Sequence, residues 1–544
     1  MSRLIPSIAF AVGLILAACS PATAPAERSA PEAAKIEAHM AFLADDALEG
    51  REAGTPGYEK AAAYVAEQLA SYGLKPAGDD GTWFQQITFR RAVRDADNLG
   101  LTVTSLNGTP VEMIENVDYV IGGSTNDSAE ITAPAVFVGF GVVAPDLGRD
   151  DYAGLDVEGK IVVMLSGTPK GIQSEERAFY GSRKTLFAAE RGAIGIVSLE
   201  TPTRRELNGF PRLIAQRRFD TASMSWLQAD GTAYSLAKGI KASSYVSLEG
   251  GAKLMQDAPV AWSDILETAE AEGGNVAGFD LPVNITIKQT SVHDVVTSPN
   301  VVALLEGSDP ELKDEYIVLT AHLDHIGIAK SIEEDRINNG ALDNAAGSAI
   351  LLEAARVLST GPAPRRSVLF VFVTAEEKGL LGAQYFAKNP TVPKEGLVAN
   401  VNMDMPIITY DFTDVIVFGA NRSTIIDSVQ TAASELNVAL SPDPVPDEGL
   451  FTRSDHFRFV EEGVPSVYLK PGWQNGGEAE FVRHMTTNYH RPSDDMSNTL
   501  NFEAGARFAD LKARIALALA NADARPVWRK DDFFARQFDG PMEP

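Results

Sequence analysis

The C-terminal half of the chain alternates between short apolar runs and longer amphipathic stretches. Five runs are mostly apolar, which predicts strands buried on both faces of a sheet: 316–321, 367–375, 397–403, 415–419 and 464–469. Residues 344–358 (NAAGSAILLEAARVL) lie between the first two runs and predict a helix. Strands that alternate with helices indicate an α/β fold with a mixed, mostly parallel central sheet sandwiched by helices.

The N-terminal half divides into two parts that differ in the spacing of their apolar residues. Residues 59–74 have apolar positions at helical spacing, which predicts a helix that joins the fold of the C-terminal half. Residues 125–290 instead contain short apolar strands bounded by Gly, Pro and Asp, with no cluster of metal-ligand residue types. We therefore expect one main domain in two parts, 35–124 and 291–544, with 125–290 as an inserted β-rich domain.

The first residues have the pattern of an export signal. Arg3 precedes an apolar run that ends in Leu-Ala-Ala-Cys, and Cys19 is the only cysteine of the chain. The ending resembles a bacterial lipobox, which implies a signal peptide over 1–19, a lipid anchor on Cys19 and a Pro/Ala-rich flexible tether over 20–34. The expected location is the periplasmic face of the cell envelope, with the outer membrane favoured by Ser20. A plain secretory signal is the alternative.

Composition narrows the function classes. Of 544 residues, 45% are hydrophobic and 22% charged, which is typical of a globular protein. The formal net charge of −27 disfavours a nucleic-acid partner, because an acidic surface repels phosphates. A single cysteine excludes a thiolate metal site, so any metal would depend on histidine and carboxylate ligands.

Residues of those ligand types follow the predicted buried strands where each strand ends. They are His322 and Asp324 after the first strand, Glu376 and Glu377 after the second, Asp404 after the third, Asp343 before the helix, and His490 nearer the C-terminus. Open α/β sheets bind ligands beyond the carboxyl ends of their strands, so these side chains should meet at one edge. Two histidines with several carboxylates suit Zn²⁺, with Mn²⁺ or Co²⁺ as alternatives. Two metals that share a bridging carboxylate would use five ligands.

Six segments together resemble the di-zinc aminopeptidases of metallopeptidase family 28, of the bacterial leucine-aminopeptidase type. They are AHLDHIG (321–327), NNGALDNAAG (338–347), TAEEKGLLGAQYF (374–386), NMDM (402–405), SDHF (454–457) and YHRPSDD (489–495). Residues 42–57 are also similar to that family. Residues 150–169 and 188–197 resemble a protease-associated domain, which the family often carries as an insertion.

The resemblance implies a role for each residue. His322 and Asp404 would hold one zinc, Glu377 and His490 the other, and Asp343 would bridge both, so that each chain takes two Zn²⁺. Glu376 would be the general base, and Asp324 would accept the free ring N–H of His322. The family also implies a cis peptide bond after Asp343. The implied activity is a zinc-dependent exopeptidase, specifically an aminopeptidase that acts on peptides.

Several alternatives stay open at this point. His484 competes with His490 as a ligand, whereas His325 is interpreted as a pocket wall or a solvated residue. Adjacent residues cannot form a serine-hydrolase relay, so Ser454-Asp455-His456 is interpreted as a wall of the substrate pocket. Gly50 and Arg51 are interpreted as structural.

Three other functions fit the same residues. A glutaminyl-cyclase-like acyltransferase with a single zinc and a carboxypeptidase would both use this fold, and a non-catalytic peptide-binding lipoprotein is a more distant alternative. The sequence leaves the oligomeric state, the preferred N-terminal residue, the native metal and the task of the inserted domain open.

Overall fold

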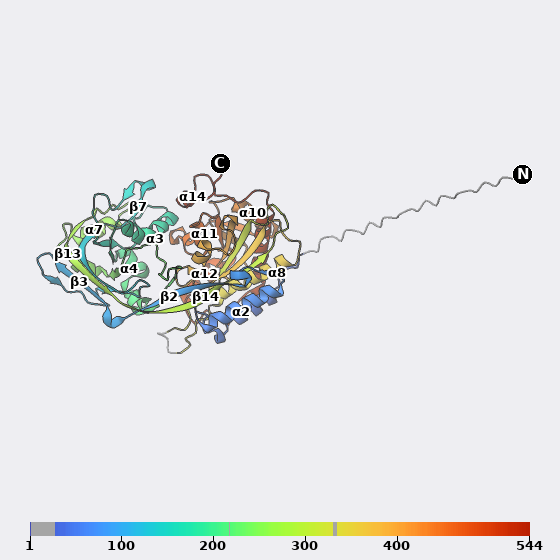
Figure 1. Cartoon of the computed structure of the whole chain (residues 1–544), viewed down its shortest axis with the longest axis horizontal. Coiled ribbons are helices and arrows are strands. Elements are labelled where there is room, and N and C mark those ends of the chain that lie inside the picture. The colour runs from blue at the N-terminus through green and yellow to red at the C-terminus, as the bar shows by residue number, and fades with distance from the viewer. Residues whose placement is uncertain (2–27, 217, 330–333) are drawn as a thin grey trace.

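The computed structural model describes Met1 and residues 28–216, 218–329 and 334–544. Cys19 and nearly all of the expected signal peptide lie outside these residues, so the lipid anchor stays a prediction. Two large β-sheets lie side by side, each with its own helices (Figure 1). Within the described residues, no helix is both long enough and apolar enough to cross a membrane.

The first sheet has ten strands, and the three strands at its centre are buried along their whole length. Its order is β11-β2-β14-β16-β15-β17-β20-β18-β19, with β1 also paired to β14. The strands are β1 (Lys75–Pro76), β2 (Phe84–Arg94), β11 (Ser223–Trp226), β14 (Ser291–Leu305), β15 (Tyr316–His322), β16 (Ser367–Val373), β17 (Leu397–Met403), β18 (Asp414–Phe418), β19 (Ala439–Ser441) and β20 (Ser466–Pro471).

Parallel pairing is confined to the middle and one edge of this sheet. Strands β16, β15, β17 and β20 form a parallel core, and β18 pairs with β19 in parallel. The neighbours β14 and β18 join that core antiparallel, as do β2 and β11 beyond β14. The mixed α/β class is thus confirmed, whereas "mostly parallel" holds for the core alone.

Helices cover both faces of the parallel core, because alternate residues of its strands point to opposite sides. Ile317 and Leu319 of β15 belong to the larger apolar cluster, and Val318 between them belongs to a smaller one. The larger cluster includes α1 (Ala33–Leu43), α2 (Pro56–Ser71), α8 (Ala346–Ser359), α10 (Ile425–Glu435) and α13 (Phe502–Asn521). The smaller one includes α9 (Leu381–Lys388) and α11 (His456–Val460). The predicted sandwich is therefore present.

The second sheet has eight strands in the order β4-β3-β13-β6-β9-β10-β12-β5. They are β3 (Gly100–Ser105), β4 (Pro110–Val111), β5 (Tyr119–Val120), β6 (Ala129–Phe137), β9 (Ile161–Leu165), β10 (Gly195–Leu199), β12 (Ala242–Val246) and β13 (Phe279–Gln289). Its part of the chain also contains the strand pair β7 (Val143–Ala144) and β8 (Arg149–Asp150), and the helices α3 (Ser174–Glu190), α4 (Pro202–Asn208), α5 (Phe210–Gln216), α6 (Leu248–Leu254) and α7 (Trp262–Glu270).

The second sheet begins earlier along the chain than the expected insertion at 125–290. Strands β3, β4 and β5 lie before residue 125 yet pair in this sheet, whereas β11 lies inside the expected insertion and pairs in the first sheet. The identity of this part as a protease-associated domain stays a prediction.

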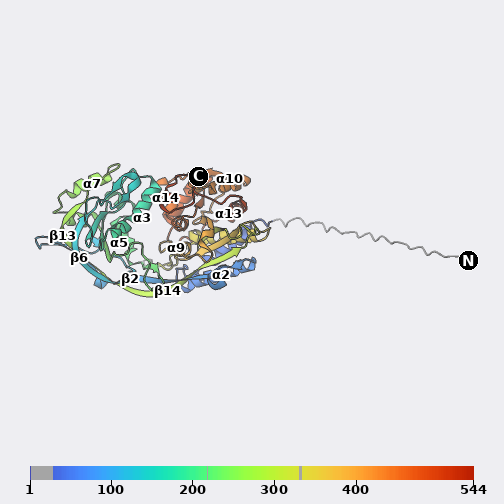
Figure 2. The same cartoon turned by 45° about the horizontal axis from the view of Figure 1, so that its top comes forward.

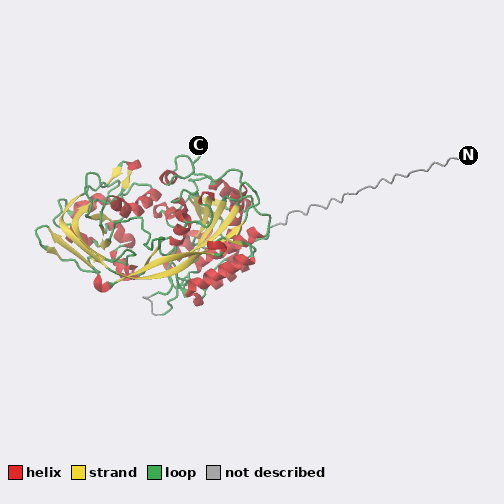
Figure 3. Ribbon diagram, in the orientation of Figure 1, coloured by secondary structure: helices red, strands yellow, loops and turns green. Residues whose placement is uncertain are grey.

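A long antiparallel pair of strands and a packed contact join the two halves of the molecule, each built around one of the two sheets. Strands β2 and β14 pair from Phe84 opposite Val301 to Arg94 opposite Ser291, and the ribbon sweeps beneath both halves (Figure 3). At the opposite side, α3 meets α14 (Phe533–Gln537) (Figure 2), where the ring of Phe179 lies 5.4 Å from that of Phe533. Arg183 of α3 also pairs with Glu461 at 2.7 Å. The halves therefore share buried apolar and charged contacts.

Candidate metal centre

The residues that follow the three central strands converge at one edge of the first sheet. His322 ends β15, Glu376 and Glu377 follow β16 after a two-residue turn, and Asp404 follows β17 directly. The strands are parallel neighbours in the order β16-β15-β17, so their carboxyl ends lie side by side. Asp343 comes from the segment before α8. His490 comes from the loop after α12 (Gly477–Thr487).

The ligand atoms form two groups that share Asp343. His322 Nε2 lies 3.4 Å from Asp343 Oδ1 and 3.3 Å from Asp404 Oδ1. His490 Nε2 lies 3.3 Å from Asp343 Oδ2 and 3.2 Å from Glu377 Oε2. Each oxygen of Asp343 thus faces a different group, and the structure brings all five sequence-predicted ligands together. The Asp343–Asn344 peptide bond is cis, as the resemblance implied.

A third histidine lies in the second group. His325 is fully buried, so the interpretation as a solvated residue is wrong. Its Nδ1 lies 2.8 Å from Glu377 Oε1 and 3.9 Å from Asp343 Oδ2. Ligand atoms of His325, Asp343 and Glu377 all lie within 4.8 Å of one another. The signal in the sequence was its position three residues after His322, directly beyond the strand end.

The side chain of Asp324 binds the backbone of Glu376 and Glu377 and does not bind the ring of His322. The ring atom Nδ1 of His322 lies 3.1 Å from the backbone carbonyl of Asp324, not from its carboxylate. The carboxylate instead accepts the backbone N–H groups of Glu376 at 3.0 Å and Glu377 at 3.3 Å. The expected hydrogen bond from His322 to the Asp324 carboxylate is therefore wrong. After β15 the chain turns so that the Asp324 carbonyl faces the His322 ring, while the Asp324 side chain reaches the residues that follow β16.

Two buried residues hold the segment that carries Asp343, and neither was assigned this role from the sequence. The carboxylate of Asp494 accepts the backbone N–H groups of Leu342 and Asp343, both at 3.0 Å. Arg51 donates to the carbonyls of Leu323 at 2.9 Å and Gly340 at 2.7 Å. The structural interpretation of Arg51 therefore fits, because this guanidinium ties the N-terminal segment to two ligand-bearing loops.

Gly50 beside it is required by close packing. Its φ is +68°, and a Cβ there would lie 2.5 Å from the carbonyl oxygen of Asn338.

We predict that Asp494→Ala weakens zinc binding by about 10- to 100-fold, the usual effect of removing a group that orients a ligand. The substitution leaves two buried N–H groups beside Asp343 without their acceptor. Titration of the metal-free protein with zinc against a chelating dye measures the change. Asp495→Ala, next in sequence, is the matched control and should bind zinc like the wild type. Equal affinity of both variants would contradict the orienting role.

The Ser454-Asp455-His456 segment contacts Asp404 through its first residue. Ser454 Oγ donates to Asp404 Oδ2 at 2.5 Å and accepts from Asn402 Nδ2 at 2.7 Å. The ring nitrogens of His456 and His484 have no hydrogen-bond partner among the described residues, and burial lowers the pKa of His484 to about 4. No serine-hydrolase relay exists here, and His484 is not part of the ligand groups.

The electrostatics of the cluster fit a bound cation. Burial raises the pKa of Glu376 well above its usual range, and the nearby carboxylates of Asp404 and Glu377 raise it further. Burial opposes the protonation of His490, yet Glu377 and Asp343 raise its pKa to about 10. Among the described residues, His325 Nε2 is buried without a hydrogen-bond partner, and the 2.8 Å contact of its Nδ1 with Glu377 Oε1 does not have hydrogen-bond geometry. Buried carboxylates need a compensating positive charge, and this donor set is one that divalent zinc accepts.

Fold and donor set together define a cation-binding α/β protein with its site at the ends of parallel strands. Residues 300–516 match the sequence profile of peptidase family M28. This segment of the chain is similar to that family.

Curated relatives of the chain carry related names. It is 27% identical over 277 residues to a probable zinc metalloprotease of Pyrenophora teres f. teres, covering 48% of this chain and 55% of that one. It is 23% identical over 483 residues to the probable lipoprotein aminopeptidase LpqL of Mycobacterium tuberculosis, covering 85% and 80%. The chain spans 55%, 64% and 65% of the length of three fungal relatives that it matches.

The fold has a counterpart among solved structures. The aminopeptidase from Aneurinibacillus sp. strain AM-1 superposes with a TM-score of 0.51 at 20% identity, covering 91% of this chain and 95% of that one. At this identity the likeness concerns the fold.

Proposed function

We propose that the protein is a zinc-dependent aminopeptidase that releases N-terminal residues from peptides. The observation that supports this most is the sharing of Asp343: its two carboxylate oxygens face two separate groups of ligand atoms. Such an arrangement suits two cations with one bridging carboxylate. The names of the relatives, a zinc metalloprotease and an aminopeptidase among them, support the same reaction class.

In this proposal His322 and Asp404 hold one Zn²⁺, Glu377 and His490 hold the other, and Asp343 binds both. His325 contacts Glu377 and orients its carboxylate. Zinc bound here would supply a Lewis acid that polarises the peptide carbonyl and makes water easier to deprotonate at neutral pH.

Glu376 is the general base in this proposal. It adjoins the ligand Glu377 in sequence, and Asp324 fixes both backbone N–H groups. Its carboxylate takes a proton from the attacking water and then returns it to the leaving amine. Glu376 is half-buried at the ends of the parallel strands.

We further propose export and a lipid anchor at Cys19, with the protein at the periplasmic face of the envelope. The support is the Leu-Ala-Ala-Cys segment and the similarity to a relative named as a lipoprotein over 85% of this chain.

The test is a substrate panel on purified zinc-loaded enzyme. Leucyl and glutamyl p-nitroanilides, their N-acetylated forms and N-blocked peptides with a free C-terminus are compared, and zinc per chain is measured by plasma emission. We expect two zinc ions and cleavage of free N-termini only. Cleavage of blocked peptides would favour a carboxypeptidase. One zinc with cyclisation of N-terminal glutamine would favour the acyltransferase. Either result would overturn the proposal.

A further inference from the structure

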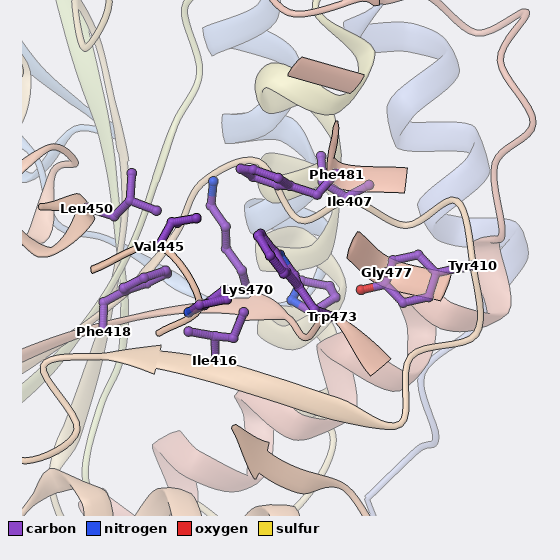
Figure 4. Close-up of a pocket in the computed structure, with 12 residues that line it drawn as sticks. Ile407, Tyr410, Ile416, Phe418, Val445, Leu450, Lys470, Trp473, Gly477 and Phe481 are labelled. Atoms are coloured by element: carbon purple, nitrogen blue, oxygen red, sulfur yellow. The ribbon is translucent and has the colours of Figure 1, made fainter. Parts of the chain in front are cut away.

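An apolar pocket adjoins the candidate metal centre. Its empty volume is about 360 Å³ when the open solvent at its mouth is included, and its walls include Ile407, Tyr410, Phe418, Leu450, Trp473 and Phe481 (Figure 4). Ile407 lies three residues after Asp404 in the sequence. Tyr468 of β20 donates its hydroxyl to the Asp404 carbonyl at 2.7 Å, and Lys470, two residues further along the same strand, lines the pocket. The pocket is therefore next to one of the proposed zinc ligands.

Lys470 is the exception to the apolar character of this pocket. The residue is 8% exposed, its ammonium has no hydrogen-bond or ion-pair partner among the described residues, and the nitrogen itself is not fully buried. Its nitrogen lies 5.3 Å from the ring of Tyr468 and 5.8 Å from the ring of Phe481. In Figure 4 the side chain passes between Val445 and Trp473, and its nitrogen ends beside Phe481.

The other buried lysines, Lys184 and Lys512, have backbone carbonyl groups as hydrogen-bond acceptors. Lys184 donates to the carbonyls of Leu165 and Gly167, at 2.5 and 2.8 Å, and Lys512 donates to the carbonyl of Asn402 at 2.9 Å. The ammonium of Lys470 has no such acceptor among the described residues, and it keeps part of its hydration because its nitrogen is not fully buried. Lys470 therefore has donors to spare in the pocket.

A second cation lies in the same region. Arg453 repels the positive charge of Lys470, and the carboxylates of Asp404 and Asp343 attract it. These carboxylates would be neutralised by cations of their own in the zinc-loaded protein, so Lys470 is not needed as their partner. Arg453 is itself paired with Glu448 at 3.0 Å. The positive charge of Lys470 therefore remains to complement a negative ligand in a chain of net charge −27.

We propose, resting on the aminopeptidase function proposed above, that this pocket receives the side chain of the substrate's N-terminal residue and that Lys470 selects an acidic one. The aliphatic part of a glutamate or aspartate side chain would pack against the aromatic walls. Its carboxylate would accept hydrogen bonds from the Lys470 ammonium, a charge-assisted contact in a dry site.

The test compares glutamyl, aspartyl, glutaminyl and leucyl p-nitroanilides on the wild type, Lys470→Met and Lys470→Arg. The anilides have no free C-terminal carboxylate, so a preference among them reports the side chain alone. We expect the wild type to prefer Glu over Gln, and Lys470→Met to lose about 10- to 100-fold in kcat/KM on Glu, mainly through KM. Leu should be unaffected or improved. Lys470→Arg should keep part of the acidic preference, and the exposed Lys313→Met is the matched control.

Two readouts separate the outcomes. Zinc content and thermal melting of each variant show whether the fold and the metal centre are intact. Calorimetry with free L-glutamate and L-leucine on zinc-loaded Glu376→Gln, with and without Lys470→Met, reports the pocket without turnover. Tighter binding of glutamate that depends on Lys470 would support the pocket even if no anilide is cleaved, a result that would count against the peptidase function alone. An equal loss on all substrates, or no preference for glutamate in either assay, would overturn the proposal.

Discussion

Replacing Glu376 with glutamine is expected to lower kcat by at least about 100- to 10,000-fold, the range that a positioned general base contributes. Glutamine has the shape of glutamate but cannot accept the proton of the attacking water. The adjacent Glu377, which the proposal assigns to zinc, is unchanged, and Asp324 still accepts both backbone N–H groups. The proposal therefore separates catalysis from metal binding at two neighbouring residues.

The measurement is steady-state kinetics on an aminoacyl p-nitroanilide together with zinc analysis of the same sample. The exposed Glu67→Gln on α2 is the matched control and should retain wild-type values. A Glu376→Gln enzyme with full zinc and a kcat within a few-fold of the wild type would rule out Glu376 as the base.

The second large effect is expected for Asp343→Asn, which should bind zinc more than about 100-fold more weakly, beyond what loss of an orienting group alone causes. Each oxygen of Asp343 lies near a different histidine, at 3.4 Å from His322 Nε2 and 3.3 Å from His490 Nε2. Asparagine preserves the shape but removes the charge and replaces one oxygen with a nitrogen that carries hydrogens. One substitution should therefore weaken the binding of both zinc ions.

Competition with a chelator measures this, and activity should fall in parallel with zinc occupancy. The exposed Asp314→Asn serves as control. If Asp343→Asn retained one tightly bound zinc at full occupancy, the two groups would be independent and Asp343 would not bridge them.

The central part of the fold could be predicted because its strands are buried on both faces. The runs that contain β15, β16 and β17 are mostly apolar and are buried along the whole strand, and the residue that follows each strand must lie at the carboxyl edge of the sheet. The convergence of His322, Glu377 and Asp404 follows from that rule alone. The antiparallel flanks were not predictable, because the short strands β3, β4 and β5 pair with partners that their own residues do not specify.

The groups that support the ligands were harder to predict, since they depend on where the chain turns. The sequence could not show whether the carbonyl or the carboxylate of Asp324 faces His322. Asp494 stood inside a motif that carried the family resemblance, yet its backbone partners Leu342 and Asp343 are more than a hundred residues away. Lys470 had no signal at all, because only the packing of β20 against Phe481 places it in the pocket.

The measurement that tests the two-zinc proposal most directly is anomalous diffraction from crystals of the zinc-loaded protein, collected on both sides of the zinc absorption edge. The proposal predicts two zinc peaks about 3.5–4 Å apart, one beside His322 and Asp404, the other beside Glu377 and His490, with Asp343 between them. A single peak in this region, or two peaks that do not share Asp343, would contradict it.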